Sequence, residues 1–145
     1  MQNPNCFPTS EQAEQAFYRS FQQGDIELMM SVWGQGKDIV CIHPGGSRLQ
    51  GVSSIRKSWE QMFSYEQGIE LRVNKTGMIQ EEDVAVHHVV EDIYVDGELQ
   101  SEIFATNIYK KTNGSWHMVL HHASAELHPV LDLMDGDAEE AQTIH

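Results

Sequence analysis

The sequence predicts one α+β domain, with helices first and a curled antiparallel sheet after them. Apolar residues recur at helical spacing in the first third of the 145-residue chain, and β-branched and aromatic residues dominate from about residue 68. Short turn signals separate the strand-like segments. A chain of this length can bury one real core but is too short for two ordinary domains.

The helical part divides into three segments. Thr9 and the residues after it offer an N-cap, and a helix then extends to Gly24, a typical C-terminal stop. Asp25 can cap a second, short helix that ends near Trp33. Residues 51–63 return to the helical period with apolar residues on one side.

The strand-like segments are five. Residues 38–43 are typical of a buried strand that ends at the turn 44–46. Four further strands are expected near residues 68–79, 84–95, 99–111 and 115–124, with turn signals at 81–83, 96–97 and 113–114. Four strands joined by hairpins would curl and cover the helices.

Charge and composition exclude several classes of protein. The chain carries 22 acidic residues against 9 Lys and Arg, a formal net charge of −13. Nucleic acids and anionic membrane surfaces need a basic footprint, so neither is an expected partner. No apolar run approaches the length of a membrane span, and the two cysteines make no disulfide framework. We therefore expect a soluble cytoplasmic domain over residues 1–125.

The last twenty residues, 126–145, differ from this domain. They hold six acidic residues and no Lys or Arg. Their first half is apolar and their second half is polar. We expect an acidic tail whose first half docks on the body or on a partner subunit and whose second half is solvated.

Two stretches of the chain resemble a known family. They are residues 40–59, with Val-Cys-Ile-His-Pro-Gly-Gly at 40–46 and Ser-Trp at 58–59, and residues 105–124, with Ala-Thr-Asn-Ile-Tyr at 105–109 and His-His-Ala-Ser at 121–124. Together they resemble the SnoaL-like family of the nuclear transport factor 2-like superfamily. The resemblance covers about residues 8 to 125. It implies a cone-shaped α+β barrel with a central pocket and a homodimer packed through the sheets. It does not imply one reaction, because relatives include isomerases, cyclases, dehydratases, ligand binders and assembly modules.

Histidine is the most promising residue type for chemistry. The resemblance places His43 and His122 in recurring motifs, where a neutral imidazole could move a proton or hold a carbonyl group. Alternatively, His43 holds the turn at 44–46 and His122 bonds Ser124 or a backbone carbonyl. Because strand side chains alternate, only one ring of each adjacent pair can face the pocket, and His88 is the candidate from the other pair.

A carboxylate and an amide are further candidates. One of Glu91 and Asp92 must face inward, and Glu91 would there be a general base with a raised pKa, or else pair with Arg72 or Lys110 on a neighbouring strand. Asn107 either positions a ligand or bridges strands. No Tyr could be assigned to a steroid-isomerase type of site.

Aromatic side chains would form the pocket wall. Trp59, Trp33 and Phe63 are the candidates, although each could equally be plain core. No Cys-x-x-Cys spacing marks a metal site, so we expect no metal and no cofactor. The alternative is a metal site assembled in space from His43, one ring of each histidine pair and Glu91. The sequence thus predicts a domain that binds a small, largely apolar organic molecule. The alternatives are a cofactor-free isomerase, cyclase or dehydratase that uses His43, His122 and Glu91, and an assembly module without catalysis.

Overall fold

The computed structural model describes residues 6–65 and 68–125. The acidic tail, and the expectation that its first half docks, lie outside this range. The helices lie on one side of a single sheet. The helices are α1 (Ser10–Gln23), α2 (Ile26–Val32) and α3 (Val52–Tyr65). The strands are β1 (Val40–Ile42), β2 (Arg48–Gln50), β3 (Ile69–Gln80), β4 (Val84–Val95), β5 (Glu98–Thr112) and β6 (Ser115–Ala125).

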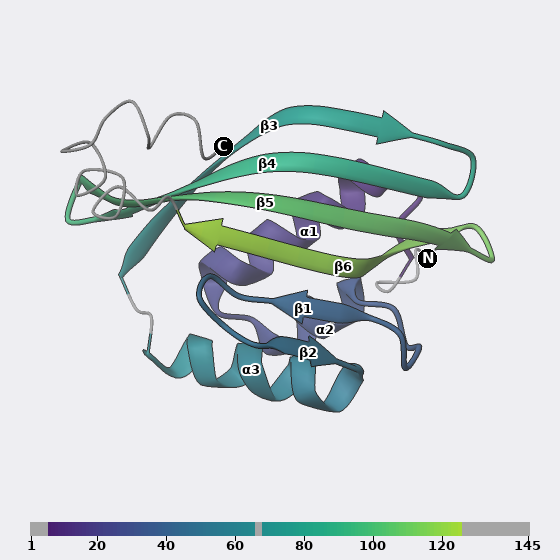
Figure 1. The fold of residues 1–145 in the computed structure, drawn as a ribbon, viewed down its shortest axis with the longest axis horizontal. Helices are drawn as coiled ribbons and strands as arrows, with labels where there is room; N and C mark the ends of the chain where they lie inside the picture. Colours follow the sequence, from purple (N-terminus) through teal and green to yellow (C-terminus); the bar gives the residue numbers. More distant parts are fainter. Residues whose placement is uncertain (1–5, 66–67, 126–145) are drawn as a thin grey trace, which may run out of the picture.

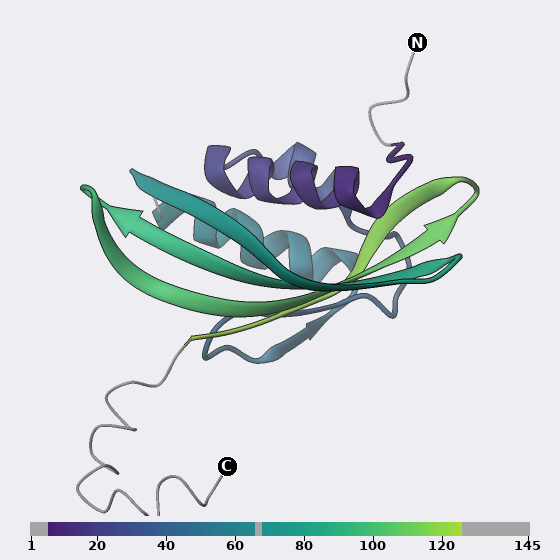
Figure 2. The ribbon, with the colours of Figure 1, turned by 90° about the horizontal axis from the view of Figure 1, so that it is seen from above.

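The sheet has the order β2-β1-β6-β5-β4-β3 (Figure 1). Neighbouring strands are antiparallel except β1 and β6, which are parallel. The sheet curls around the helices without closing, since β2 and β3 remain its two edges (Figure 2). The expected cone is therefore confirmed as an open, curled sheet rather than a closed barrel.

The predicted helix boundaries follow from the caps. The Thr9 hydroxyl accepts the backbone N–H of Gln12 at 3.1 Å. Gly24 ends α1 in the left-handed conformation with φ +67°, which glycine adopts without the strain of a Cβ. Asp25 caps α2 through the backbone N–H of Leu28. Strand β2 was not expected: its three residues, Arg48 to Gln50, are too few to show a period.

The core fills the space between the helices and the concave face of the sheet. Its largest fully buried apolar side chains come from the three helices, from the residue that ends α2, and from β5 and β6. They include Phe17, Met29, Trp33, Ile55, Trp59, Tyr109 and Met118. No helix in the described part of the chain is both long and apolar enough to cross a bilayer. The same concave face carries the polar side chains considered next.

Candidate functional site

A network of buried polar side chains crosses the interior of the cone. Its members come from α1, β4, β5 and β6, and all are at most 8% exposed: Ser10, Glu14, Tyr18, His87, Glu91, Asn107, Tyr109 and His121. Their spacing explains why they meet. The three α1 residues follow one another at intervals of four, which places them on one helix face, and the strand residues occupy inward positions of the alternating pattern.

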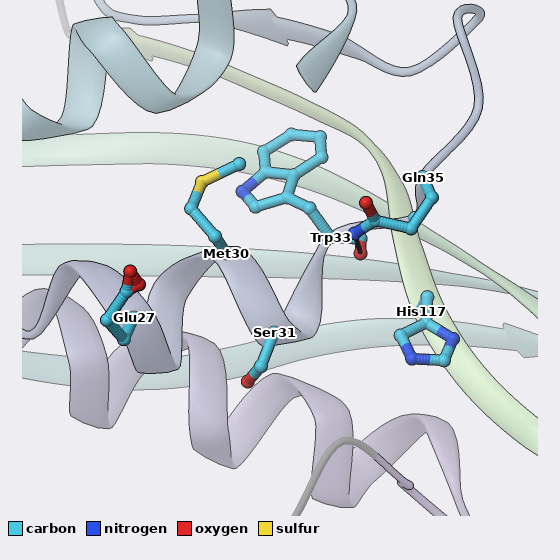
Figure 3. A pocket seen from close by; sticks show the side chains of 7 residues that line it. Glu27, Met30, Ser31, Trp33, Gln35 and His117 are labelled. Atoms are coloured by element: carbon cyan, nitrogen blue, oxygen red, sulfur yellow. Dashed lines mark hydrogen bonds between the residues drawn. The ribbon is translucent and has the colours of Figure 1, made fainter. Parts of the chain in front are cut away.

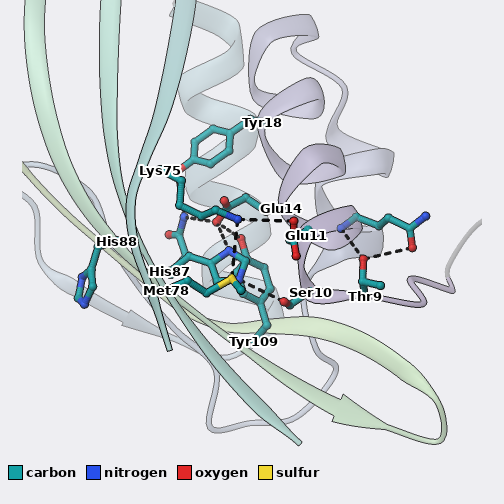
Figure 4. Close-up of polar contacts among 12 residues, drawn as sticks. Thr9, Ser10, Glu11, Glu14, Tyr18, Lys75, Met78, His87, His88 and Tyr109 are labelled. Carbon is teal, nitrogen blue, oxygen red and sulfur yellow. Dashed lines mark hydrogen bonds and ion pairs between the residues drawn. The ribbon is translucent and has the colours of Figure 1, made fainter. Parts of the chain in front are cut away.

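Glu14 is the centre of this network. Its Oε2 atom accepts the Tyr109 hydroxyl at 3.0 Å and lies 2.8 Å from Nδ1 of His87. The Asn107 amide nitrogen approaches the same oxygen at 3.4 Å. Figure 4 shows Glu14 together with His87 and Tyr109. Through this one oxygen, Glu14 joins α1 to β4 and β5.

Glu91 is a second carboxylate with different surroundings. The Tyr18 hydroxyl donates to its Oε2 at 2.6 Å. Burial raises the pKa of Glu91 to about 7, with a further rise from the charge of Glu14, while the Tyr18 hydrogen bond opposes this rise. Burial also raises the pKa of Tyr18 well above its usual value, so the phenol keeps its proton. Near neutral pH, Glu91 can therefore either hold or release a proton.

Asn107 connects this pair to His121. Its amide nitrogen donates to the Tyr18 oxygen at 2.8 Å, and its amide oxygen lies 2.6 Å from Nδ1 of His121. An amide oxygen can only accept, so His121 carries its hydrogen on Nδ1. Burial, with smaller contributions from His43 and His122, lowers the pKa of His121 to about 3. The imidazole is therefore neutral.

An aromatic cluster adjoins the network on the α3 side. The Trp59 ring contacts Phe17 at 5.6 Å between centroids, His43 at 4.7 Å and Phe63 at 5.7 Å. Nε2 of His43 lies 3.0 Å from the Ser58 hydroxyl, and burial lowers the pKa of His43. The interior thus combines a polar band with an aromatic wall.

The predicted residues divide between these places. The structure places Glu91 and Asn107 in the polar network, and His43, Trp59 and Phe63 in the aromatic cluster. Glu91 pairs with Tyr18 instead of Arg72 or Lys110; Arg72 pairs with Glu70. Trp33 is fully buried at the end of α2.

His88 and His122 lie elsewhere, and their roles remain predictions. Both rings are on the outer, convex face of the sheet, beside a cleft of about 300 Å³, whereas His87 and His121 are buried in the interior. The adjacent pairs do send one ring to each face as expected. Both faces of these strands carry apolar residues, so the pattern did not indicate which ring was inside.

Trp33 also lines a separate cleft, of about 540 Å³, between α2 and the start of β6. Glu27, Met30, Ser31, Gln35 and His117 line it as well (Figure 3). The Gln35 side chain donates to the Trp33 carbonyl oxygen, two residues earlier in the chain, at 3.4 Å. This cleft does not reach the residues of the polar network.

Sequence reasoning did not single out Ser10, Glu14 or Tyr18 as site residues. A usable signal was present, because polar residues at intervals of four on the apolar face of an amphipathic helix must be buried. Among the described residues, no group of three or more His, Cys, Asp or Glu side chains could hold a metal ion. The side chains of the network are hydrogen-bond donors and acceptors to one another.

Known proteins share this architecture. A proposed calcium/calmodulin-dependent protein kinase type II association domain from Thiobacillus denitrificans is 35% identical, with a TM-score of 0.81, over 83% of this chain and 98% of that one. A proposed dehydratase of the nuclear transport factor 2-like family from Streptomyces avermitilis is 27% identical, with a TM-score of 0.72, over 79% of this chain and 91% of that one.

A curated plant protein is similar in sequence. The F-box protein SKIP8 of Arabidopsis thaliana is 29% identical over 111 residues, which is 77% of this chain. The chain spans about half, 47%, of the length of that relative. The SnoaL-like domain matches residues 11–128, a range that contains α1 from its second residue, α2, α3, the strands β1 to β6 and every network residue except Ser10. The chain belongs to the SnoaL-like domain family, within the nuclear transport factor 2-like superfamily.

Proposed function

We propose that this domain binds a small organic carbonyl compound inside the cone and moves a proton on it without a cofactor. The observation that carries the proposal is the Tyr18–Glu91 pair, a phenol hydroxyl 2.6 Å from a buried carboxyl group. Glu91 is 1% exposed. A carboxyl group kept in such a place costs stability, which favours a functional reason for it.

The chemistry follows from the proton positions. Ionised Glu91 would take a proton from the carbon next to the carbonyl group, and Tyr18 would donate to the oxygen on which negative charge develops. Glu91 would then return the proton to another atom of the substrate, as in an isomerisation or a dehydration. Glu14 contacts His87 and Tyr109 whereas Glu91 accepts from Tyr18, so the two carboxyl groups have separate roles. The 27% identity to a proposed dehydratase supports this class of reaction.

Ligand access would lie between α1 and the edge strand β3. There the Gln22 side chain accepts the Leu71 N–H and donates to the Ile69 carbonyl oxygen, and Lys75 pairs with Glu11 at 3.7 Å between Nζ and Oε2. These contacts are exposed, so a ligand could displace them at small cost.

Carbon–hydrogen exchange tests this proposal. A panel of simple cyclic ketones in deuterium oxide would be followed by NMR for protein-dependent uptake of deuterium next to the carbonyl group. We expect Glu91→Gln to slow exchange by about 10²–10⁴-fold and Tyr18→Phe to slow it as well. Tyr94→Phe, which changes a tyrosine on the outer face, is the matched control. Exchange that equals the buffer rate, or that survives Glu91→Gln, would reject the proposal.

A second candidate function, assembly, rests on the outer face of the sheet. Three of its large apolar side chains are exposed: Ile79 by 55%, Phe104 by 45% and Val84 by 40%. One carboxylate oxygen of Asp92 is buried without a hydrogen-bond partner among the described residues, which a second molecule could supply. The relative at 35% identity is described as an association domain. We therefore propose a homodimer packed through the outer faces of the sheets.

Native mass spectrometry tests the assembly and reports any retained small molecule. We expect a dimer for the natural chain and a monomer for Phe104→Glu, because a charge would be buried at the interface. Tyr65→Glu is the control, since Tyr65 is an exposed aromatic residue on the helical layer. A monomeric natural chain, or a dimer that tolerates Phe104→Glu and not Tyr65→Glu, would rule out this interface.

A further inference from the structure

Three residues of the network have the order of a nucleophile, a base and an orienting acid. The Ser10 hydroxyl oxygen lies 3.1 Å from Nε2 of His87. On the other side of the ring, Nδ1 of His87 lies 2.8 Å from Oε2 of Glu14. Ser10 and His87 take no part in the carbonyl chemistry proposed for Tyr18 and Glu91.

The hydrogen bonds of His87 favour one tautomer. Glu14 Oε2 accepts the Tyr109 hydroxyl, and a hydrogen on Nδ1 of His87 would let the ring donate to the same oxygen. Nε2 then carries a lone pair that could take the Ser10 proton once the hydroxyl, which donates to the Gln80 amide oxygen in this structure, turns towards it. This tautomer is the one in which a histidine can take a proton from a serine.

A second serine–histidine contact in the molecule lacks this arrangement. The Ser58 hydroxyl lies 3.0 Å from Nε2 of His43, but it already donates to the carbonyl oxygen of Ile55 at 2.8 Å. Its hydrogen is therefore engaged, and His43 must donate to it. Ser58 serves as an internal comparison of similar distance: its competing acceptor is a backbone oxygen within α3, whereas that of Ser10 is the exposed side chain of Gln80.

The position of Ser10 adds a stabilising group for the reaction. Ser10 is the first residue of α1, a helix of 14 residues. The Thr9 side chain and the Thr9 carbonyl oxygen take the N–H groups of Gln12 and Ala13. The N–H groups of Ser10 and Glu11 belong to the first turn and have no acceptor within the helix. Donors at that position can stabilise an oxyanion formed at the serine.

One polar side chain covers Ser10 and competes for its proton. The amide oxygen of Gln80, an exposed residue at the end of β3, lies 3.1 Å from the Ser10 hydroxyl oxygen. The Gln80 amide nitrogen donates to the Glu81 carbonyl oxygen at 2.8 Å, which holds the amide in this orientation. Ser10 is only 2% exposed, so displacement of Gln80 is required before a substrate can reach it.

We propose that Ser10 is an acyl-accepting nucleophile for small carboxylic esters, with His87 as its base and Glu14 as the acid that orients His87. The Ser10 oxygen bonds to the ester carbonyl carbon and its proton passes to Nε2 of His87. The bond from that carbon to the alcohol oxygen breaks, and the alcohol leaves with the proton. Water then repeats the sequence on the acyl-serine, releasing the carboxylic acid and restoring Ser10.

A fluorophosphonate probe tests the proposal on the full chain, with intact mass and peptide mapping as readouts. We expect one phosphonyl group on Ser10, none on Ser10→Ala, and labelling at least about threefold faster in Gln80→Ala, where Ser10 loses its competing acceptor and its cover. Gln50→Ala, an exposed glutamine at the end of β2, is the matched control and should label at the natural rate. His87→Gln should label about 10²-fold more slowly, and hydrolysis of p-nitrophenyl acetate should follow the same order.

The opposite results are equally clear. If neither the natural chain nor Gln80→Ala acquires a group on Ser10, the proposal is wrong, since Gln80 is exposed and its loss does not threaten the fold. A group found on Ser58 at a similar rate would also overturn it, because the hydroxyl of that serine is held by a backbone oxygen that cannot be displaced as Gln80 can.

Discussion

Glu91 should make the folded protein less stable as the pH rises through the range in which this carboxyl group titrates. In the unfolded chain it ionises with the ordinary pKa of 4.5, and in the folded protein burial raises that pKa to about 7. Between these values the folded state retains a proton that the unfolded state has released. The free energy of unfolding therefore falls with pH over this window and is constant above it.

The magnitude follows from the shift. About 2.5 pKa units at 1.36 kcal/mol each correspond to about 3 kcal/mol lost between pH 4.5 and 7. Glu91→Gln removes the titration while its amide oxygen can still accept the Tyr18 hydroxyl. We expect the variant to gain about 3 kcal/mol relative to the natural chain as the pH rises from 4.5 to 8.

Urea unfolding at a series of pH values measures this difference. Subtracting the two curves cancels the titration of every other group, including the acidic residues of the tail. Asp92→Asn, a change at the neighbouring position whose side chain points outward, controls for loss of a charge. A difference between natural chain and Glu91→Gln that is the same at pH 5 and pH 8 would refute the assignment of a buried, protonated carboxyl group.

Three further outcomes are expected. Burial lowers the pKa of His121 to about 3 in the folded protein, so below pH 6.5 the unfolded chain binds a proton at this residue that the folded chain does not bind. The free energy of unfolding should therefore fall as the pH falls from 6.5 towards 3. His121→Gln should lose part of this acid sensitivity in urea unfolding, and an unchanged pH profile would contradict the prediction. Thr9→Ala removes the cap on the Gln12 N–H and should lower the free energy of unfolding by about 1 kcal/mol, whereas Thr9→Ser should not; equal losses would argue against a capping role. The Arg56–Glu27 ion pair joins two exposed side chains at 2.8 Å, and a double-mutant cycle should give less than about 1 kcal/mol, with a larger coupling showing that the pair is shielded from water.

Most of the fold could be predicted because its signals are local. The cap at Thr9, the stop at Gly24 and the hairpin turns at 96–97 and 113–114 act within a few residues, and long strands show their composition clearly. Strand β2 was missed because three residues carry no period. The open edge of the sheet was missed because closure depends on the pairing of distant strands.

The site could be predicted only in part, for a physical reason. Glu91 and Asn107 interrupt strands of mostly apolar residues, and a polar residue at such a position is expected to be buried or functional. Choosing His121 over His122 needs the register of the whole sheet against the helices, because both faces of β6 are partly apolar. The partnership of Tyr18 with Glu91 joins residues 73 positions apart, and no local pattern specifies such a pair.

The parallel contact between β1 and β6 has a consequence for synthesis. β1 pairs Val40 with Leu120, and Phe7, ahead of α1, bonds Ser115 across 108 positions. The sheet therefore cannot form around the amino-terminal helices and β1 until β6 has left the ribosome. A chain that stops before Ser115 would leave the edge of β5 unpaired and its apolar residues uncovered, a species prone to aggregate. For this protein, loss of the final strand should be far more damaging than its length of 11 residues indicates.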